Sequence, residues 1–173
     1  NAIAASEGMS RCAWVRPFDD PEQTLGALYS GDGPRGPKAL PGYYQVKLAV
    51  AGKTQTAPLK LTMDPRFQPV EGAVQKQFEL AMQVRDRISQ LHQAINEIRE
   101  TKTQIGALKK RFAENERVKP ALAAAAELEK KADAIEGVLM QVKRKRSEGN
   151  LVDPTELNEE CYSCNYTIEA DDG

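Results

Sequence analysis

Hydrophobic residues recur at every third or fourth position over a long stretch in the second half of the chain. The series runs from Val74 to Phe112, and this spacing is typical of an amphipathic α-helix. The helix would contain about 39 residues and measure roughly 58 Å at 1.5 Å per residue. A gap in the series at residues 101–102 and a glycine at Gly106 mark its weakest points.

A second helical pattern follows a short polar loop. Pro120 suits the first turn of a helix, and apolar residues then recur up to Val142. The basic residues after Val142 and the glycine at Gly149 are typical of a helix C-terminus. Two long helices joined by a short loop predict an antiparallel helical hairpin.

The last segment of the chain predicts a third, shorter helix. Asp153 and Pro154 are well placed as its N-cap and its first residue. Its apolar seam would consist of residues spaced by four, three and four, namely Leu157, Cys161, Cys164 and Ile168. If this helix packs back along the second one, its acidic residues would lie near the basic run at residues 143–146.

The region before the helices alternates between apolar and polar residues with a period of two. Residues 44–50 form the first such run, and Gly52 supplies the turn to a returning strand that includes Leu59 and Leu61. This pattern predicts a β-hairpin with one apolar face. Pro58 lacks an amide donor, so it is expected on an edge or at a bulge.

The remaining β region is less regular. Residues 10–18 alternate well enough to form a strand, whereas residues 27–42 are rich in glycine and proline and predict a loop. We therefore expect an α+β chain in which residues 1–66 form a β-rich, sandwich-like region, with a small antiparallel sheet of three or four strands over residues 7–66. Residues 67–173 would form the helical hairpin and the third helix, with the sheet packed at one end of a helical core.

Charge is unevenly distributed although the net charge is only −1. Residues 67–147 carry 16 basic and 11 acidic side chains, whereas residues 148–173 carry 8 acidic side chains and no basic one. We expect the acidic tail to fold onto the basic helical region. The basic region lacks interleaved aromatic residues, so the sequence predicts no nucleic-acid partner. No stretch approaches the roughly 18 apolar residues needed to span a membrane.

The cysteines Cys161 and Cys164 form the most tempting chemical motif. Two thiolates at this spacing could make half of a zinc site or a redox pair. A second ligand pair is missing from the sequence, and Cys12 and His92 are its only further cysteine and histidine. Both cysteines fall on an apolar seam, where cysteine behaves as a small hydrophobic residue. Core packing is therefore the expected role, and no metal or other cofactor is predicted.

Other candidate residues have simple structural interpretations. His92 has no nucleophile beside it in the sequence and is expected on the surface of the long helix or flanking its apolar face. The basic run at residues 143–146 suits a helix end, and no carboxylate pair is marked for hydrolysis. Trp14, Tyr43 and Tyr44 could form a platform on which a sugar stacks, although core and strand packing is the expected role for such residues.

The β region resembles the C-terminal region of bacterial BNR (Asp-box) repeat proteins, which are sortilin-like or glycosyl-hydrolase-annotated β-propeller proteins. The resemblance extends over residues 7–112 and departs from the family pattern at Cys12 and Val15. The matching positions are Gly8, Trp14, Gly36, Pro37, Pro41, Gly42, Tyr44, Val46, Leu48, Gly52, Asp64, Pro65 and Arg66.

The resemblance implies an immunoglobulin-like sheet, because family members carry further strands before this segment. Whether the sheet here is truncated stays open. It also implies a secreted, periplasmic or cell-envelope location and an upstream β-propeller as a partner. Any hydrolase activity would belong to that propeller rather than to this chain.

Three functions follow as hypotheses. The leading one is a non-catalytic accessory or assembly module, which could also form a homo-oligomer through exposed helical seams. The second is a carbohydrate-binding module that uses Trp14, Tyr43 and Tyr44. The third is a part of a glycoside hydrolase whose catalytic residues lie outside this chain.

Overall fold

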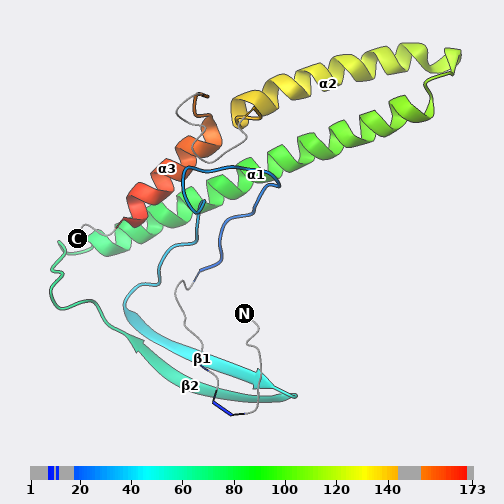
Figure 1. Ribbon diagram of the computed structural model, residues 1–173. Coiled ribbons are helices and arrows are strands. Elements are labelled where there is room, and N and C mark those ends of the chain that lie inside the picture. Colours follow the sequence, from blue (N-terminus) through cyan, green and yellow to red (C-terminus); the bar gives the residue numbers. More distant parts are fainter. Residues whose placement is uncertain (1–7, 10, 12–17, 144–152, 171–173) are drawn as a thin grey trace.

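The computed structural model describes residues 8–9, 11, 18–143 and 153–170. Over these residues the chain is an α+β protein, as the sequence predicts (Figure 1). A two-stranded antiparallel sheet precedes the helices. The elements in chain order are β1 (Gly42–Val50), β2 (Lys53–Leu61), α1 (Ala73–Arg111), the 3-10 helix η1 (Glu116–Val118), α2 (Lys119–Leu139) and α3 (Leu157–Glu169).

The β-hairpin forms where the alternating pattern predicts it. Tyr44 lies opposite Leu59 and Val46 lies opposite Ala57, so the apolar residues of both strands share one face. The turn residues Ala51 and Gly52 both have positive φ, at 48° and 77°. Two positive φ values match the twist of a tight hairpin, and a glycine adopts such a value without steric cost.

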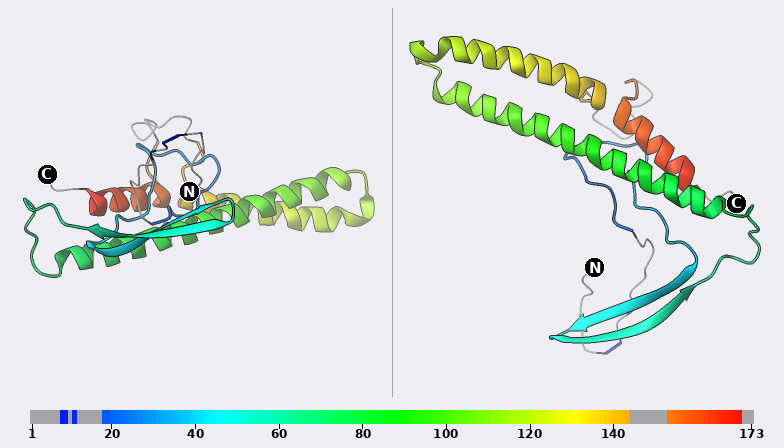
Figure 2. Two further views of the ribbon diagram at one scale, coloured as in Figure 1. Left: turned by 90° about the horizontal axis from the view of Figure 1, so that it is seen from below. Right: turned by 180° about the vertical axis from the view of Figure 1, so that it is seen from behind.

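The position of the hairpin differs from the prediction that the sheet packs at one end of the helices. Among the described elements, β1 and β2 contact only each other, and the hairpin stands apart from the helices (Figure 2). The reason is that residues 19–37, which we call the strap, occupy the facing surface of α1. The further strand expected at residues 10–18 lies outside the described residues apart from Arg11 and Phe18.

The long helix α1 is confirmed at 39 residues. It follows Gly72, whose φ of 72° turns the chain into the helix, and its last turn carries three basic residues that suit the negative end of the helix dipole. One side of the helix is buried, and the hydrophobic residues there are Ala81, Ile88, Leu91, Ile95 and Ile105.

The helix α2 runs antiparallel to α1, and together they form a protruding arm (Figure 1). Pro120 lies in its first turn, as predicted. The helix ends at Leu139, earlier than the predicted end near residues 144–150, because Met140 adopts an extended conformation. This change of direction allows Met140 to bury its side chain in the core to 3% exposure.

The third helix begins later than predicted and packs mainly along α1. It starts at Leu157 with Glu156 as N-cap, and not at Asp153. The carbonyl of Pro154 accepts a hydrogen bond from Gln141 Nε2 at 3.3 Å, which ties the preceding segment to the end of α2. The helix α3 then lies along the N-terminal half of α1 and continues the line of α2 (Figure 1).

The centre of the core lies where three helices meet the strap. Leu91 and Ile95 of α1 pack against Met140, with Ala27, Leu139 and Cys161 around them. Burial of these side chains stabilises the junction by the hydrophobic effect. The strap therefore belongs physically to the helical body, although it precedes the hairpin in the sequence.

Candidate functional site

The predicted sugar platform is not assembled from the residues that the structure describes. Trp14 lies outside the described residues. Tyr43 is 82% exposed, and Lys60 Nζ lies 5.4 Å from the centre of its ring. Tyr44 follows it in the strand and therefore faces the opposite side of the sheet, where its hydroxyl donates to the Leu40 carbonyl at 2.7 Å.

The cysteines of α3 differ in their surroundings. Cys161 is half-buried beside Leu91 and Ile95, in agreement with the predicted packing role. Burial, helped by neighbouring Cys164 and Glu160, raises the pKa of the Cys161 thiol and disfavours the thiolate. Cys164 is exposed, so its predicted place on a buried seam is wrong. Both cysteines are free thiols.

Metal-binding groups do not gather in the part of the chain that the structure describes. No three His, Cys, Asp or Glu side chains there are arranged to hold a metal ion. In the same residues, no helix has the length and apolar character to cross a membrane.

His92 is fully buried, whereas the sequence predicts a position on the surface of the helix or flanking its apolar face. Its side chain has 0% exposure, because the strap crosses α1 at this point. The Nδ1 atom lies 2.5 Å from the Glu22 carbonyl, which can only accept, so Nδ1 carries the proton. Burial lowers the pKa of His92, although the Glu22 carbonyl and carboxylate oppose this shift.

Tyr29 completes a buried polar contact with His92. Its hydroxyl lies 2.6 Å from Nε2, and it donates because Nε2 is the unprotonated nitrogen. Burial raises the pKa of Tyr29 to about 12, with Glu159 and Cys161 adding to the effect and a hydrogen bond with Asn158 opposing it. The ring of Tyr29 also contacts Tyr162 of α3 with 5.1 Å between centroids.

Helix α3 holds the other half of the strap through side-chain contacts with its backbone. Asn165 accepts from the Arg35 amide at 3.1 Å and donates to the Arg35 carbonyl at 3.3 Å. Glu159 accepts from both the amide and the hydroxyl of Ser30. At Arg35 both the backbone donor and the backbone acceptor are satisfied, so this part of the strap packs against α3 without regular secondary structure.

Helix α1 holds the first half of the strap in the same way. Asn96 accepts from the Thr24 hydroxyl at 2.6 Å and donates to the Gln23 carbonyl at 3.2 Å. Arg99 donates to the Leu25 carbonyl and forms an ion pair with Glu136 at 2.6 Å. Four polar side chains hold the strap to the helices, and we call them the clamp: Asn96, Arg99, Glu159 and Asn165. Because their polar groups are engaged with the strap, they form a structural contact rather than a catalytic constellation.

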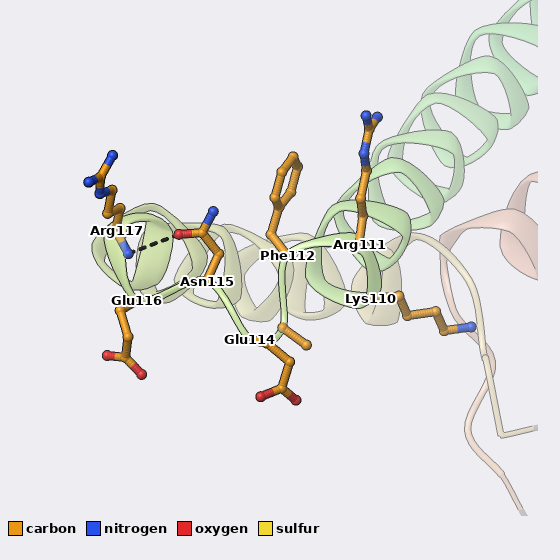
Figure 3. A pocket seen from close by; sticks show the side chains of 8 residues that line it. Lys110, Arg111, Phe112, Glu114, Asn115, Glu116 and Arg117 are labelled. Carbon is orange, nitrogen blue, oxygen red and sulfur yellow. Dashed lines mark hydrogen bonds between the residues drawn. The ribbon is translucent and has the colours of Figure 1, made fainter.

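The loop at the tip of the arm encloses a shallow depression (Figure 3). Asn115 accepts from the Arg117 amide at 3.1 Å and caps η1. Arg111 lies 5.4 Å from the centre of the Phe112 ring. The labelled side chains diverge from one another in Figure 3, so no group of them converges on a ligand.

A larger groove lies at the base of the hairpin, with a volume of about 830 Å³. It lies between the end of β2, the start of α1 and the end of α3, and Leu61, Met63 and Phe78 contribute to an apolar lining. Three of the polar side chains that line it are engaged within the chain, because Asp64 pairs with Arg66 and Gln77 donates to the Ile168 carbonyl. The groove therefore offers apolar contact with little polar specificity.

The most distinctive surface is the apolar face of the hairpin. We call it the apolar sheet face and define it as Tyr44, Val46, Leu48, Val50, Ala57, Leu59 and Leu61. Val46, Leu48 and Val50 remain 51%, 48% and 56% exposed. Leu61 connects this face to the groove at the hairpin base. The two features together form one continuous apolar surface, which is the candidate functional site.

The alternating pattern identified the residues of the apolar sheet face but not their exposure. A half-buried strand and an exposed one have the same pattern, because the pattern reports which residues share a face and not what covers it. The sequence gives a weaker indication of the strap contacts. Asparagine occupies a half-buried position of α1 at Asn96 and a buried position of α3 at Asn165. Asparagine is a poor helix former, so such positions hint at a specific hydrogen-bonding role.

Comparison of the chain with family models, with curated proteins and with solved structures finds no match.

Proposed function

We propose that this chain is a non-catalytic interaction module at the C-terminus of a larger, secreted BNR-repeat protein. In this proposal the apolar sheet face docks onto the apolar face of a second β-sheet in that parent protein. The observation that carries the proposal is the exposure of Val46, Leu48 and Val50 on a hairpin that contacts no described helix.

The physics of small sheets supports a β-sheet as the occupant. An isolated two-stranded hairpin is at best marginally stable in water and needs further strands or a packed face. Two sheets pack with their apolar faces about 10 Å apart and with side chains interdigitating. The opposite face of this hairpin carries Gln45, Lys47, Thr54 and Thr56, which suit contact with water.

The charge of the surface also favours an uncharged, apolar occupant. The strand residues on the same side of the hairpin as the apolar sheet face include one charged residue, Lys53, which lies next to the turn. A charged polymer would find no complementary groups along the rest of the face. An apolar sheet suits the rest of this face, where the polar side chain is that of Gln55, opposite Leu48.

The resemblance to BNR-repeat proteins supports the same occupant. In that family, strands that precede this region complete an immunoglobulin-like sandwich, and a β-propeller lies upstream. A secreted, periplasmic or cell-envelope location belongs to this proposal. The clamp around Tyr29 and His92 supports a module that orients the hairpin, because it fixes the strap that leads into β1.

Hydrogen exchange can test the docking of the hairpin in the parent protein. We expect the amides of β1 and β2 to be protected at least about tenfold more in the parent protein than in this chain alone, because docking suppresses local opening. This chain alone should bind a hydrophobic dye through the exposed face, and the parent protein should bind less dye per molecule. Equal protection in the two proteins would contradict the proposal.

Two alanines provide a matched pair of variants. Ala57 lies on the apolar sheet face, whereas Ala49 lies on the other face, and both are exposed. Ala57→Lys should abolish the additional protection in the parent protein because it buries an unpaired charge in the interface. Ala49→Lys should leave it unchanged. A harmless Ala57→Lys variant would exclude this face as the docking surface.

A further inference from the structure

Helix α2 carries two hydrophobic seams with coiled-coil spacing. The inner seam faces α1 and consists of partly or fully buried residues spaced by three and four, namely Leu122, Ala125, Glu129, Ala132, Glu136 and Leu139. Charged residues occupy two of these positions. Glu129 pairs with Lys109 and Glu136 pairs with Arg99 and Lys102. The contact between α1 and α2 therefore depends partly on ion pairs.

The outer seam begins one residue earlier and has the same spacing. It consists of Ala121, Ala124, Leu128, Lys131, Ile135 and Val138, all of which are exposed. Leu128, Ile135 and Val138 retain 51%, 54% and 65% of their accessible surface. An apolar repeat of three and four residues is the pattern by which a helix packs against another helix. None of the described elements buries this seam.

We propose that the outer seam of α2 pairs antiparallel with the outer seam of α2 in a second copy of this chain. This pairing is independent of the apolar sheet face and goes beyond the docking proposed above. It would join the arms of two molecules into a four-helix arrangement.

The distribution of side-chain sizes along the outer seam favours the antiparallel direction. The first part of the seam carries Ala121 and Ala124, and its later part carries Ile135 and Val138. An antiparallel register that is centred between residues 129 and 130 places Ile135 over the partner's Ala124. The same register places Val138 over the partner's Ala121. Large side chains thus fill the space left by small ones along the whole contact.

The charged residue of the outer seam favours the same direction. In a parallel pair, Lys131 would lie directly opposite the partner's Lys131, and like charges at such a position are repulsive. In the antiparallel register, Lys131 lies opposite the partner's Leu128. Its aliphatic stem can cover that leucine while its ammonium group reaches the partner's Glu127 at the edge of the contact.

The expected strength of the dimer follows from the length of α2. The helix has 21 residues and spans roughly 31 Å. A contact along one such helix belongs to the small interfaces of less than about 1,200 Å², which are typical of transient association. We therefore expect dissociation in the micromolar range for this chain alone.

Sedimentation equilibrium over a range of concentrations tests the pairing. We expect a reversible monomer–dimer equilibrium for the full chain. Ala124→Glu should weaken dimerisation at least about tenfold, because it places a charge under the partner's Ile135. The matched control is Ala123→Glu, which changes an exposed alanine next to the seam and should leave the equilibrium unchanged. Circular dichroism should show equal helix content for both variants.

Cross-linking with a short bis-maleimide tests the direction of the pairing. In a background in which Cys12, Cys161 and Cys164 are changed to serine, the double variant Ala124→Cys and Ile135→Cys should cross-link into a dimer. Each single variant should not, because in the antiparallel register two equivalent residues at position 124 lie about 16 Å apart along the axis.

The outcomes of these experiments are decisive in both directions. A chain that stays monomeric at millimolar concentration would overturn the proposal. Cross-linking of the single variants would overturn the antiparallel register, since only a parallel pair brings position 124 of both copies together. Equal effects of Ala123→Glu and Ala124→Glu would show that the outer seam is not the contact.

Discussion

The hydroxyl of Tyr29 donates to Nε2 of His92 across 2.6 Å, inside the body of the protein and between segments 63 residues apart in the sequence. The contact joins the strap to the middle of α1, and His92 in turn donates from Nδ1 to the Glu22 carbonyl. The imidazole therefore bridges a side chain and a backbone group of the strap while it is neutral.

Removal of the Tyr29 hydroxyl should destabilise the fold. In Tyr29→Phe, Nε2 of His92 would remain buried without its donor, which costs about 1–3 kcal/mol. Urea unfolding followed by circular dichroism would measure the change in the free energy of unfolding. Tyr43→Phe is the control, because the ring of Tyr43 is exposed and its variant should have the stability of the unchanged protein. A stable Tyr29→Phe variant would show that the contact contributes little.

The neutral form of His92 makes stability depend on pH. The pKa of His92 is lowered in the folded state by burial, so the folded protein binds fewer protons than the unfolded chain below the ordinary value of about 6.5. This contribution to stability is complete above that pH and is lost as the pH falls through the lower, folded value.

A series of urea titrations between about pH 5 and pH 7.5 would measure this dependence. The His92→Gln variant should be less stable at neutral pH but should show a flatter dependence on pH in this window. If the variant and the unchanged protein have parallel profiles, another group must account for the dependence.

Glu136 should contribute more to the free energy of unfolding than Glu129, which lies about two turns earlier in α2. Glu136 is buried, and although burial raises its pKa, the hydrogen bonds and charges of Lys102 and Arg99 outweigh this effect and lower it. Glu136→Gln should cost about 1–3 kcal/mol, because it weakens charge-assisted hydrogen bonds in a buried position.

The control for Glu136 is the pair of Glu129 and Lys109, whose side chains are each 32% exposed. Glu129→Gln should therefore cost less than about 1 kcal/mol. Thermal unfolding of both variants at neutral pH would rank them. The reverse order of stability would mean that the arm, and not the junction with the strap, is the site where charge contributes most.

Two glycines should respond in opposite ways to substitution by alanine. A Cβ atom at Gly36 would lie 2.4 Å from the carbonyl oxygens of both Phe18 and Asp19, so Gly36→Ala requires the strap backbone to move. We expect a loss of at least about 2 kcal/mol. Gly106 lies in α1 with open space around it, and Gly106→Ala should stabilise the helix by about 0.5–1 kcal/mol. Denaturant midpoints of the two variants would test the contrast.

Periodic patterns predicted the elements that have one apolar face. The series from Val74 to Phe112 placed α1 to within one residue at each end, since a long 3.6-residue period has no competing interpretation. The alternation and the glycine turn predicted the hairpin for the same reason. Candidate site residues within these elements could thus be assigned to a face, as Tyr43 and Tyr44 show.

The packing of the elements could not be predicted because it depends on the strap. The strap has no period of its own, and its place is determined by hydrogen bonds with Asn96 and Asn165, which lie far away in the sequence. The strap also buries His92, for which the sequence predicts a position on the surface or flanking the apolar face. The hydrogen bonds of Asn165 join the strap to α3, which packs mainly along α1 and not back along α2, an arrangement that no local pattern encodes.

The clamp has a mechanical consequence for the hairpin. The hairpin is tethered on one side through the strap and on the other side through residues 62–72, which lead directly into α1. A force that pulls the hairpin away from the body would first load the hydrogen bonds between Asn165 and Arg35. It would then load those between Glu159 and Ser30. The strap should therefore peel off before α1 unwinds, and the module would yield gradually under tension instead of breaking at once.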